Sequence, residues 1–295
     1  MVRKALLSAL AAVCLAIPAV GQAAGDYLDV YVVNVKPEKQ ADFEALAKKM
    51  ADANRKYNGD RWLGLEAVYG DTTTAMFVST RNSYADIDKA GDAFMAALNK
   101  AYGKETTKKM LNDWNNCIAS SRTELRRRRW DLSRKAPTDA AAYAKLIGES
   151  RVLRTTAVHI RPGRITDFEA LMKDAKEAAE KMDNTQPLLV SQVIEGGKGT
   201  TFYVTGLRSG LDGFDKNPTV RDILGEEGYK KFLQVSSETI ENTESMVLRY
   251  SPEMSAPAEQ VIAAAPNYWT PKTETVAKTA KPKAAVEPAA EKQKQ

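Results

Sequence analysis

An internal repeat is the feature of this chain that most restricts its fold. The segment PEKQADFEAL at residues 37–46 aligns without gaps to the segment PGRITDFEAL at residues 162–171, and six of the ten positions are identical. The predicted elements also follow in the same order on both sides of these segments. A repeat spaced by roughly the length of a small domain predicts two structurally similar units in one chain.

Each copy predicts the element order β-α-β-β-α-β. A β-rich run at residues 30–35 or 155–160 ends at a proline, and the helix that follows carries apolar side chains at three-and-four spacing. This order is that of the ferredoxin-like fold, in which one antiparallel sheet carries helices on a single face. Two such sheets can cover each other's bare faces. The expected fold class is therefore α+β, with two ferredoxin-like repeats packed into one barrel. Two domains that never meet are the alternative, and each would expose an apolar sheet face.

The strand–proline–helix entry, with its Asp-Phe-Glu-Ala-Leu start, resembles the dimeric α/β-barrel superfamily. That group includes antibiotic-biosynthesis monooxygenase-like, stress-responsive, NIPSNAP-like and haem-degrading members. The resemblance covers residues 26–133 and 151–254 and is one of pattern, without a diagnostic catalytic motif. Because members of the family usually dimerise, it implies a tandem fusion that forms a pseudo-dimeric barrel within one chain.

The predicted organisation has five parts. A positively charged start, an apolar stretch and a small-residue cleavage site indicate a secretory signal. A polar connector with a short alanine-rich helix joins the repeats, and the Ala-, Pro-, Lys- and Glu-rich end predicts a disordered tail. The boundaries are 1–24 for the signal peptide, 25–133 for the first repeat, 134–150 for the linker, 151–254 for the second repeat and 255–295 for the tail.

The signal predicts export to the periplasm or the outside of the cell, with no stable membrane insertion after its removal. Between positions 25 and 250, 35 basic residues nearly balance 33 acidic ones. Such a balance lacks the concentrated basic field of a nucleic-acid-binding protein. Cys117 is the single cysteine after cleavage, which excludes an intramolecular disulfide, and one histidine leaves no ligand set for a metal.

Strand alternation predicts which side chains face the space between the two sheets. Positions that are apolar in both copies, such as Leu63 with Leu188 and Met76 with Phe202, are assigned to the helix side. The alternate positions form a mixed, partly apolar inner face of the kind that holds small molecules. Its candidate ligand-binding residues are Asn34, Trp62, Glu66, Phe77, His159, Ser191 and Tyr203.

His159 is the candidate catalytic residue, because it is the only histidine of the chain. A lone histidine on a strand is more often a structural side chain than an acid, a base or a haem ligand. The haem-handling members of the superfamily carry further signature residues that are not found here. No cofactor is therefore expected, and haem in particular has no support from the residues.

Four consecutive arginines at residues 126–129 allow two interpretations. Two of them point to each face of a strand, and a pair facing the cleft would form an anion site for carboxylate or phosphate. The second interpretation, which we favour at this stage, is an edge strand protected against aggregation by its charge. Arg129 alone has a matched arginine, Arg249, in the other copy, and it is the candidate ligand-binding residue of this run.

Three functions are compatible with these features, and whether the protein is an enzyme stays open. The poverty of catalytic side chains favours an exported binding or scaffold module for a small hydrophobic or anionic molecule in the cleft. A second hypothesis is an envelope-interaction protein whose tail contacts a partner. The third is a cofactor-independent oxygenase or isomerase that uses Trp62, Asn34 and His159, and it depends on analogy of fold.

Overall fold

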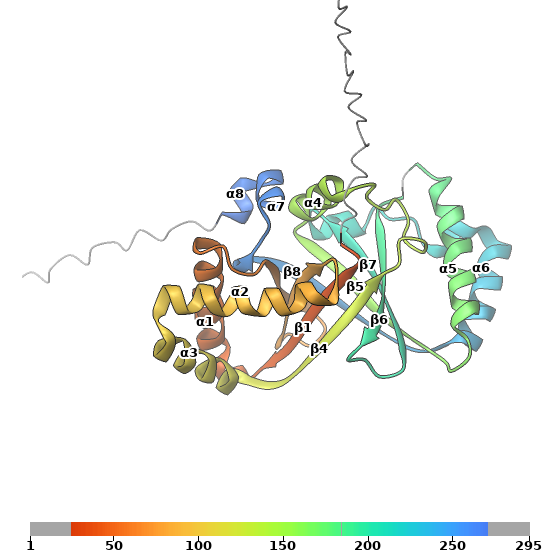
Figure 1. Cartoon of the computed structure of the whole chain (residues 1–295). Coiled ribbons are helices and arrows are strands. Elements are labelled where there is room, and N and C mark those ends of the chain that lie inside the picture. Colours follow the sequence, from red (N-terminus) through yellow and green to blue (C-terminus); the bar gives the residue numbers. More distant parts are fainter. Residues whose placement is uncertain (1–24, 184, 271–295) are drawn as a thin grey trace, which may run out of the picture.

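All strands of the protein belong to one closed antiparallel barrel in the computed structural model, which describes residues 25–183 and 185–270. The predicted signal peptide and residues 271–295 of the predicted tail lie outside the described residues. Strand order around the barrel is β1-β3-β2-β8-β5-β7-β6-β4, and β4 closes onto β1 (Figure 1). The strands are β1 (Tyr27–Val35), β2 (Trp62–Tyr69), β3 (Thr74–Arg81), β4 (Ile118–Arg128), β5 (Val152–Ile160), β6 (Leu188–Glu195), β7 (Thr200–Arg208) and β8 (Ile240–Ala256).

Helices cover the barrel from outside on two opposite sides and at one end (Figure 1). Helices α1, α2 and α3 lie beside the first four strands, α5 and α6 beside the last four, and α4, α7 and α8 lie at the end. None of these described helices is long and apolar enough to cross a membrane. The helices are η1 (Pro37–Lys39), α1 (Gln40–Lys56), α2 (Tyr84–Tyr102), α3 (Lys104–Cys117), α4 (Ala140–Glu149), α5 (Ile165–Glu180), η2 (Leu211–Phe214), α6 (Val220–Thr239), α7 (Glu259–Ala264) and α8 (Pro266–Trp269).

The barrel consists of two contiguous groups of four strands. The first has the spatial order β4-β1-β3-β2 and the second β8-β5-β7-β6, and they meet where β2 pairs with β8 and β4 pairs with β6. The α+β class and the barrel expected from the sequence are therefore present. Because β4 pairs with β1 on one side and β6 on the other, residues 126–129 are not on an edge strand. That interpretation of the arginine run is wrong.

The first strand of each group divides its side chains between the two faces as predicted. Val33 and Val35 of β1 pack with Phe43 of α1 outside the barrel, whereas Val30 and Val32 lie in the core cluster inside it. On β5, Val158 and Ile160 pack on the outer side in the same way. Alternation with a period of two thus places one set under the helices and the other in the interior.

On β2 and β3 of the first group the predicted faces are reversed. Leu65 and Met76 lie in the core inside the barrel, and Trp62 and Phe77 lie outside it against α1 and α2. In the second group the prediction is correct, since Phe202 packs under α5 and Tyr203 points inward. Assigning matched positions of the two copies to the same face requires equal numbers of residues between the helix and the strands in both copies. A one-residue difference in spacing reverses every side chain of a strand.

The last part of β8 explains why Trp62 lies on the helix side. Strand β2 pairs Trp62 with Ala256 but Gly64 with Ser251, so the segment between these two β8 positions bulges toward α1. Trp62 Nε1 donates a hydrogen bond to the carbonyl of Met254 at 2.7 Å. A side chain at position 64 would place Cβ only 2.9 Å from the same carbonyl oxygen, so only glycine fits there.

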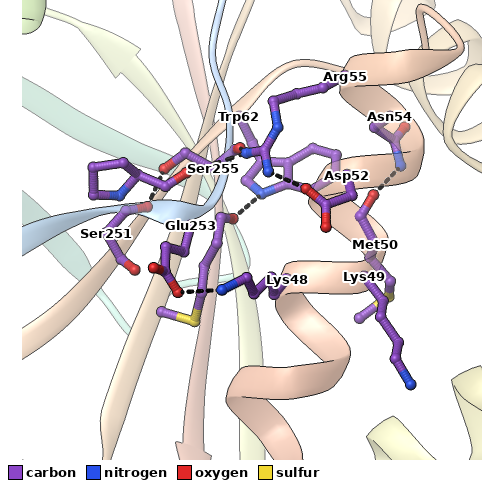
Figure 2. A network of polar contacts seen from close by, with 12 residues as sticks. Lys48, Lys49, Met50, Asp52, Asn54, Arg55, Trp62, Ser251, Glu253 and Ser255 are labelled. Atoms are coloured by element: carbon purple, nitrogen blue, oxygen red, sulfur yellow. Dashed lines mark hydrogen bonds and ion pairs between the residues drawn. The ribbon is translucent and has the colours of Figure 1, made fainter. Parts of the chain in front are cut away.

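Figure 2 shows how α1 holds this bulge of β8. Arg55 donates hydrogen bonds to the carbonyl oxygens of Pro252, at 3.1 Å, and of Ser255. Lys48 forms an ion pair with Glu253 at 2.9 Å. Because α1 lies near the start of the chain and β8 near the end of the described part, these contacts connect the two groups of strands outside the barrel as well.

Residues 255–270, predicted to begin a disordered tail, are ordered against one end of the barrel. Trp269 of α8 is 0% exposed and packs with Tyr250 in the core inside the barrel. Its indole Nε1 donates to the carbonyl of Gly148 on α4 at 2.8 Å, while Tyr268 donates to the carbonyl of Tyr250 at 2.6 Å. The local composition is polar and alanine-rich, but the buried Trp269 and the partly buried Tyr268 outweigh the entropy of ordering a short segment.

Replacing the buried anchor should measure what α8 contributes to the fold. We expect Trp269→Ala to lower the free energy of unfolding in urea by about 3–5 kcal/mol, the range for a buried aromatic side chain. Tyr69→Ala serves as the control, because Tyr69 is 63% exposed, and it should change stability by at most about 0.5 kcal/mol. A loss below about 1 kcal/mol for Trp269→Ala would mean that α8 is not anchored as described.

Candidate functional site

Two cavities lie on opposite faces of the first group of strands. The helix–sheet cavity, of about 380 Å³, lies between the outer face of β1, β2 and β3 and the helices α1, α2 and α3. The barrel cavity, of about 80 Å³, lies inside the barrel. The space between the two sheets, expected to be the main cleft, is therefore largely filled by side chains.

Five aromatic rings line the helix–sheet cavity. Trp62 and Phe94 contact each other edge to face, with ring centroids 5.8 Å apart. Phe77 lies 5.7 Å from Trp114 and 6.4 Å from Tyr31 between ring centroids. These five rings come from three strands and two helices, so the cavity exists only because the helices pack on the outer face of the sheet. Flat apolar walls of this kind suit a ring-containing molecule.

A three-residue ionic cluster forms the polar side of the helix–sheet cavity. Arg81 of β3 makes two hydrogen bonds to Asp60, at 2.7 and 2.8 Å, and lies 3.3 Å from Asp29 of β1. Burial lowers the pKa of Arg81, but the two carboxylates outweigh it and raise the pKa above its ordinary value. Two carboxylates with one guanidinium leave the cluster with one net negative charge, which disfavours an anionic ligand.

A charged wall lies on one side of the barrel interior. Glu124 and Arg126 of β4 are each 4% exposed and are joined by a hydrogen bond of 2.8 Å from Arg126 Nε. The guanidinium of Arg126 stacks on the ring of Tyr203 at 3.4 Å, and the Tyr203 hydroxyl donates to Glu124 at 3.2 Å. Burial alone would raise the pKa of Glu124, but Arg126 and Arg122 together lower it below its ordinary value.

The structure does not bring the predicted catalytic trio together. Strands β1 and β5 are four places apart in the eight-strand order and lie on opposite sides of the barrel, so Asn34 and His159 belong to opposite walls. Asn34 Nδ2 donates to Asp71 at 2.6 Å, and His159 Nδ1 lies 3.0 Å from the Thr201 hydroxyl. Trp62 lies outside the barrel, in the helix–sheet cavity. A mechanism that uses all three side chains on one substrate is therefore excluded by their positions.

The other predicted ligand-binding residues are distributed over several places. Ser191 lines the barrel cavity and Phe77 the helix–sheet cavity. Glu66 lies on the outer side of β2, not the inner face that was predicted, near the carboxylates of Glu44 and Glu253. Arg129 also lies outside the barrel.

Arg129 has the contacts of a structural residue. Its guanidinium pairs with Glu169 of α5 at 2.6 Å and with Asp131 at 2.7 Å, and it donates to Gln192 at 3.0 Å. It also lies 5.7 Å from the centre of the Phe202 ring. These contacts attach the segment after β4 to α5 and leave little of the side chain available for a ligand.

Among the described residues, no group of three or more His, Cys, Asp or Glu side chains could hold a metal ion. Cys117 is buried, and burial raises the pKa of its thiol, which makes it less reactive. His159 lines neither of the two cavities.

Sequence reasoning missed the ionic cluster and the tryptophan of α3. Asp29 and Tyr31 alternate with Val30 and Val32 on β1, so the period of the strand already places them on the helix side. The predicted ligand-binding residues were all assigned to the inner face, apart from Arg129. An acidic residue on the apolar, helix-covered face of a strand was the signal that could have revealed the cluster around Arg81.

No protein-family model matches this chain, and no curated protein matches its sequence. Solved structures with a similar backbone include a monooxygenase-like protein of Fusobacterium nucleatum, with a TM-score of 0.49, 13% identity and coverage of 77% of this chain and 93% of that chain. A monooxygenase-like protein of Lactobacillus acidophilus has a TM-score of 0.46, 9% identity and coverage of 77% and 94%. Chlorite dismutase of Candidatus Nitrospira defluvii, in complex with imidazole, has a TM-score of 0.45 and 10% identity, with coverage of 82% of this chain and 95% of that chain. No residue role is transferred from these proteins to this chain.

Replacing Glu66 should test the electrostatics of the outer side of β2. Burial, Glu44 and Glu253 raise the pKa of Glu66 in the folded protein, so ionising it destabilises the fold above its unfolded pKa of about 4.3. We expect Glu66→Gln to raise the free energy of unfolding at pH 7 by up to about 1 kcal/mol. The gain should disappear below about pH 4, where glutamate is protonated in both states.

The control for this measurement is Glu241→Gln, at an exposed position of β8. Urea unfolding at several pH values should show no comparable pH-dependent gain for it. A stability gain for Glu66→Gln that persists unchanged at low pH would contradict the electrostatic explanation.

Proposed function

We propose that this protein binds a ring-containing small molecule, neutral or positively charged, in the helix–sheet cavity. The single observation that carries the proposal is the set of aromatic rings around a cavity of about 380 Å³. Trp62 and Trp114 are 8% and 9% exposed, so both are held in place by packing and need no rearrangement to receive a ligand.

The helix–sheet layer of the second group is filled by the segment after β4. Its helix–sheet layer contains Leu132, which is 1% exposed and packs with Phe168 and Phe202. The Arg129 side chain also enters this layer between α5 and β7. The segment after β4 thus occupies space in the helix–sheet layer of the second half, as the β8 bulge with Met254 does in the layer of the first half.

The charge of the cavity specifies the ligand further. Asp29 and Asp60 share the one guanidinium of Arg81, so a carboxylate or phosphate would meet net repulsion there. A ligand that donates hydrogen bonds to these carboxylates is favoured. The small hydrophobic molecule expected from the sequence is retained in this proposal, but its place moves from the inside of the barrel to the outside of the first sheet.

An oxygenase or isomerase remains a second candidate for the same cavity. Aromatic walls next to a buried acid–base cluster can hold an aromatic substrate and accept a proton from it. Asp60, 2.7 Å from Arg81, is the nearest candidate for a proton acceptor. The earlier trio of Trp62, Asn34 and His159 is not part of this candidate.

We also propose that the barrel is a pseudo-dimer produced by tandem duplication. The matching spatial orders β4-β1-β3-β2 and β8-β5-β7-β6 support this origin, together with the repeated PEKQADFEAL-like segment. Export, and contact of residues 271–295 with an envelope partner, are separate proposals that depend on sequence outside the described residues.

The binding proposal is tested by filling the cavity. Isothermal titration with 2-naphthol should give saturable binding, and the anion 2-naphthoate should bind at least about tenfold more weakly because of the net negative cluster. Leu111 of α3 lines the cavity, and Leu111→Trp should abolish 2-naphthol binding. Leu233 of α6 is 50% exposed, so Leu233→Trp is the matched control and should bind normally.

Two outcomes would contradict the proposal. Absence of 2-naphthol binding to the unmodified protein would remove the basis for a ring-binding site. Equal affinities of the Leu111→Trp and Leu233→Trp variants for 2-naphthol would show that 2-naphthol binds elsewhere.

Deleting residues 271–295 tests the envelope proposal. If the tail contacts an envelope partner, the truncated protein should shift from the envelope fraction to the free fraction when cells are fractionated. An unchanged distribution would exclude this role. The deletion leaves α7 and α8 intact, so the fold should not be affected.

A further inference from the structure

Strand β4 presents charged side chains to the barrel interior, whereas the strand in the corresponding place of the other group presents apolar ones. Arg126 of β4 lies opposite Leu28 of β1, and Leu248 of β8 lies opposite Leu153 of β5. Two residues further along, Arg128 has Tyr250 as its counterpart. The interior is thus polar on one wall and apolar on the other.

The charges on this wall do not balance. Glu124 is the one carboxylate in it, and it is already bonded to Arg122 and Arg126, each at 2.8 Å. Arg128 is 7% exposed, and within the described residues it forms no ion pair. Its Nη2 donates to the Thr80 hydroxyl at 3.0 Å.

A buried nitrogen of Arg128 is left without a hydrogen bond. Its Nε is buried and has no partner among the described residues. The guanidinium carbon lies over the ring of Tyr143, 4.1 Å from the ring centre, a contact that does not neutralise its charge. An unpaired buried cation with an unsatisfied donor costs several kcal/mol in general. Such a group is expected at a site that an anion occupies.

We propose that the barrel cavity binds a short-chain monocarboxylate of one to three carbons, with its carboxylate on the guanidinium groups of Arg128 and Arg126. Both arginines line the cavity, as does the Ser191 hydroxyl, which is paired in register with Arg128. A carboxylate accepts parallel hydrogen bonds from a guanidinium, and the pair is stronger than a neutral hydrogen bond.

The size and the remaining lining of the cavity determine this class of ligand. A cavity of about 150 Å³ holds benzene, so the barrel cavity, of about 80 Å³, holds a molecule of roughly half that size. Away from the arginines most of the wall is apolar and includes Val30, Leu65 and Leu207, while the hydroxyls of Thr155 and Thr205 are hydrogen-bonded to each other. A fully polar anion such as nitrate would leave oxygen atoms against these side chains, whereas an alkyl group fits them.

A route to the cavity lies at the end of the barrel that carries α4 and α7. A groove of about 470 Å³ between these helices and strands β2 and β3 shares Leu63, Val78, Tyr143 and Ile147 with the lining of the barrel cavity. Tyr143 thus contacts the groove with its side chain while its ring covers Arg128. A rotation of this partly buried side chain would connect the two spaces.

The test uses the full chain and carbon-13-labelled acetate and propionate, observed by NMR in a constant chloride background. We expect saturable binding of both acids with millimolar affinity, together with a rise of the unfolding temperature that follows their concentration. Hexanoate and nitrate should bind at least about tenfold more weakly, for reasons of size and polarity.

Two neighbouring arginines provide a matched pair of variants. Arg128→Leu should abolish acetate binding and should raise the unfolding temperature in carboxylate-free buffer, because it removes an unpaired buried charge. If Arg128 were purely structural, its replacement by leucine would lower the unfolding temperature in carboxylate-free buffer. Arg127 points outward and lies 5.8 Å from the Tyr27 ring, so Arg127→Leu should bind acetate normally.

A third variant keeps the test decisive if Arg128→Leu does not fold. Ser191→Leu retains both arginines and fills the cavity, and it should also lose acetate binding. The proposal is overturned if the unmodified protein binds neither acid, if acetate binds equally to the Arg128→Leu or the Ser191→Leu variant, or if nitrate or hexanoate binds as tightly as acetate.

Discussion

Closure of the barrel through two strand pairings is the constraint on which the other features of the structure depend. Where β2 meets β8 and β4 meets β6, the last free strand edges find partners, and the inner face of every strand becomes part of one enclosed core. An enclosed core must be packed to the density of a protein interior. The larger space for a ligand is therefore found outside the sheet, under the helices of the first group, and only a small cavity remains inside.

Closure also determines the electrostatics of the interior. On an open sheet the arginines of β4 would extend into water, but in the barrel Arg126 and Arg128 are almost completely buried. Their charges can then be compensated only by groups within the barrel, and Glu124 is shared between Arg122 and Arg126. The opposite wall, with Leu248 and Tyr250, contributes no charge. The polar and apolar walls of the small cavity thus result from two strands that occupy corresponding places but differ in sequence.

The agreement between the predicted and the observed strand faces differs from strand to strand. The faces of β1 and β5 were correctly predicted, because each begins a repeat and is followed directly by the aligned segment. The faces of β2 and β3 were reversed, since the spacing between helix and strand differs between the copies. Trp62 illustrates the consequence: its position depends on a hydrogen bond to Met254, nearly two hundred residues later in the chain. No local pattern reports such a contact, and the same holds for Trp269 in its place against α4.

The sequence by itself determined the α+β class, the order of the strands in each repeat and the barrel, because these depend on local periodicity and on the repeat. It did not separate α2 from α3, which divide at Gly103 where one helix was predicted. Only the tertiary structure decided which face of β2 and β3 is covered, where the segment after β8 packs, and which arginines are buried. The physical reason is the two-residue period of a strand, in which a shift of one position exchanges inside and outside. Pairing and docking between distant segments fix that position, and they depend on contacts that neighbouring residues do not reveal.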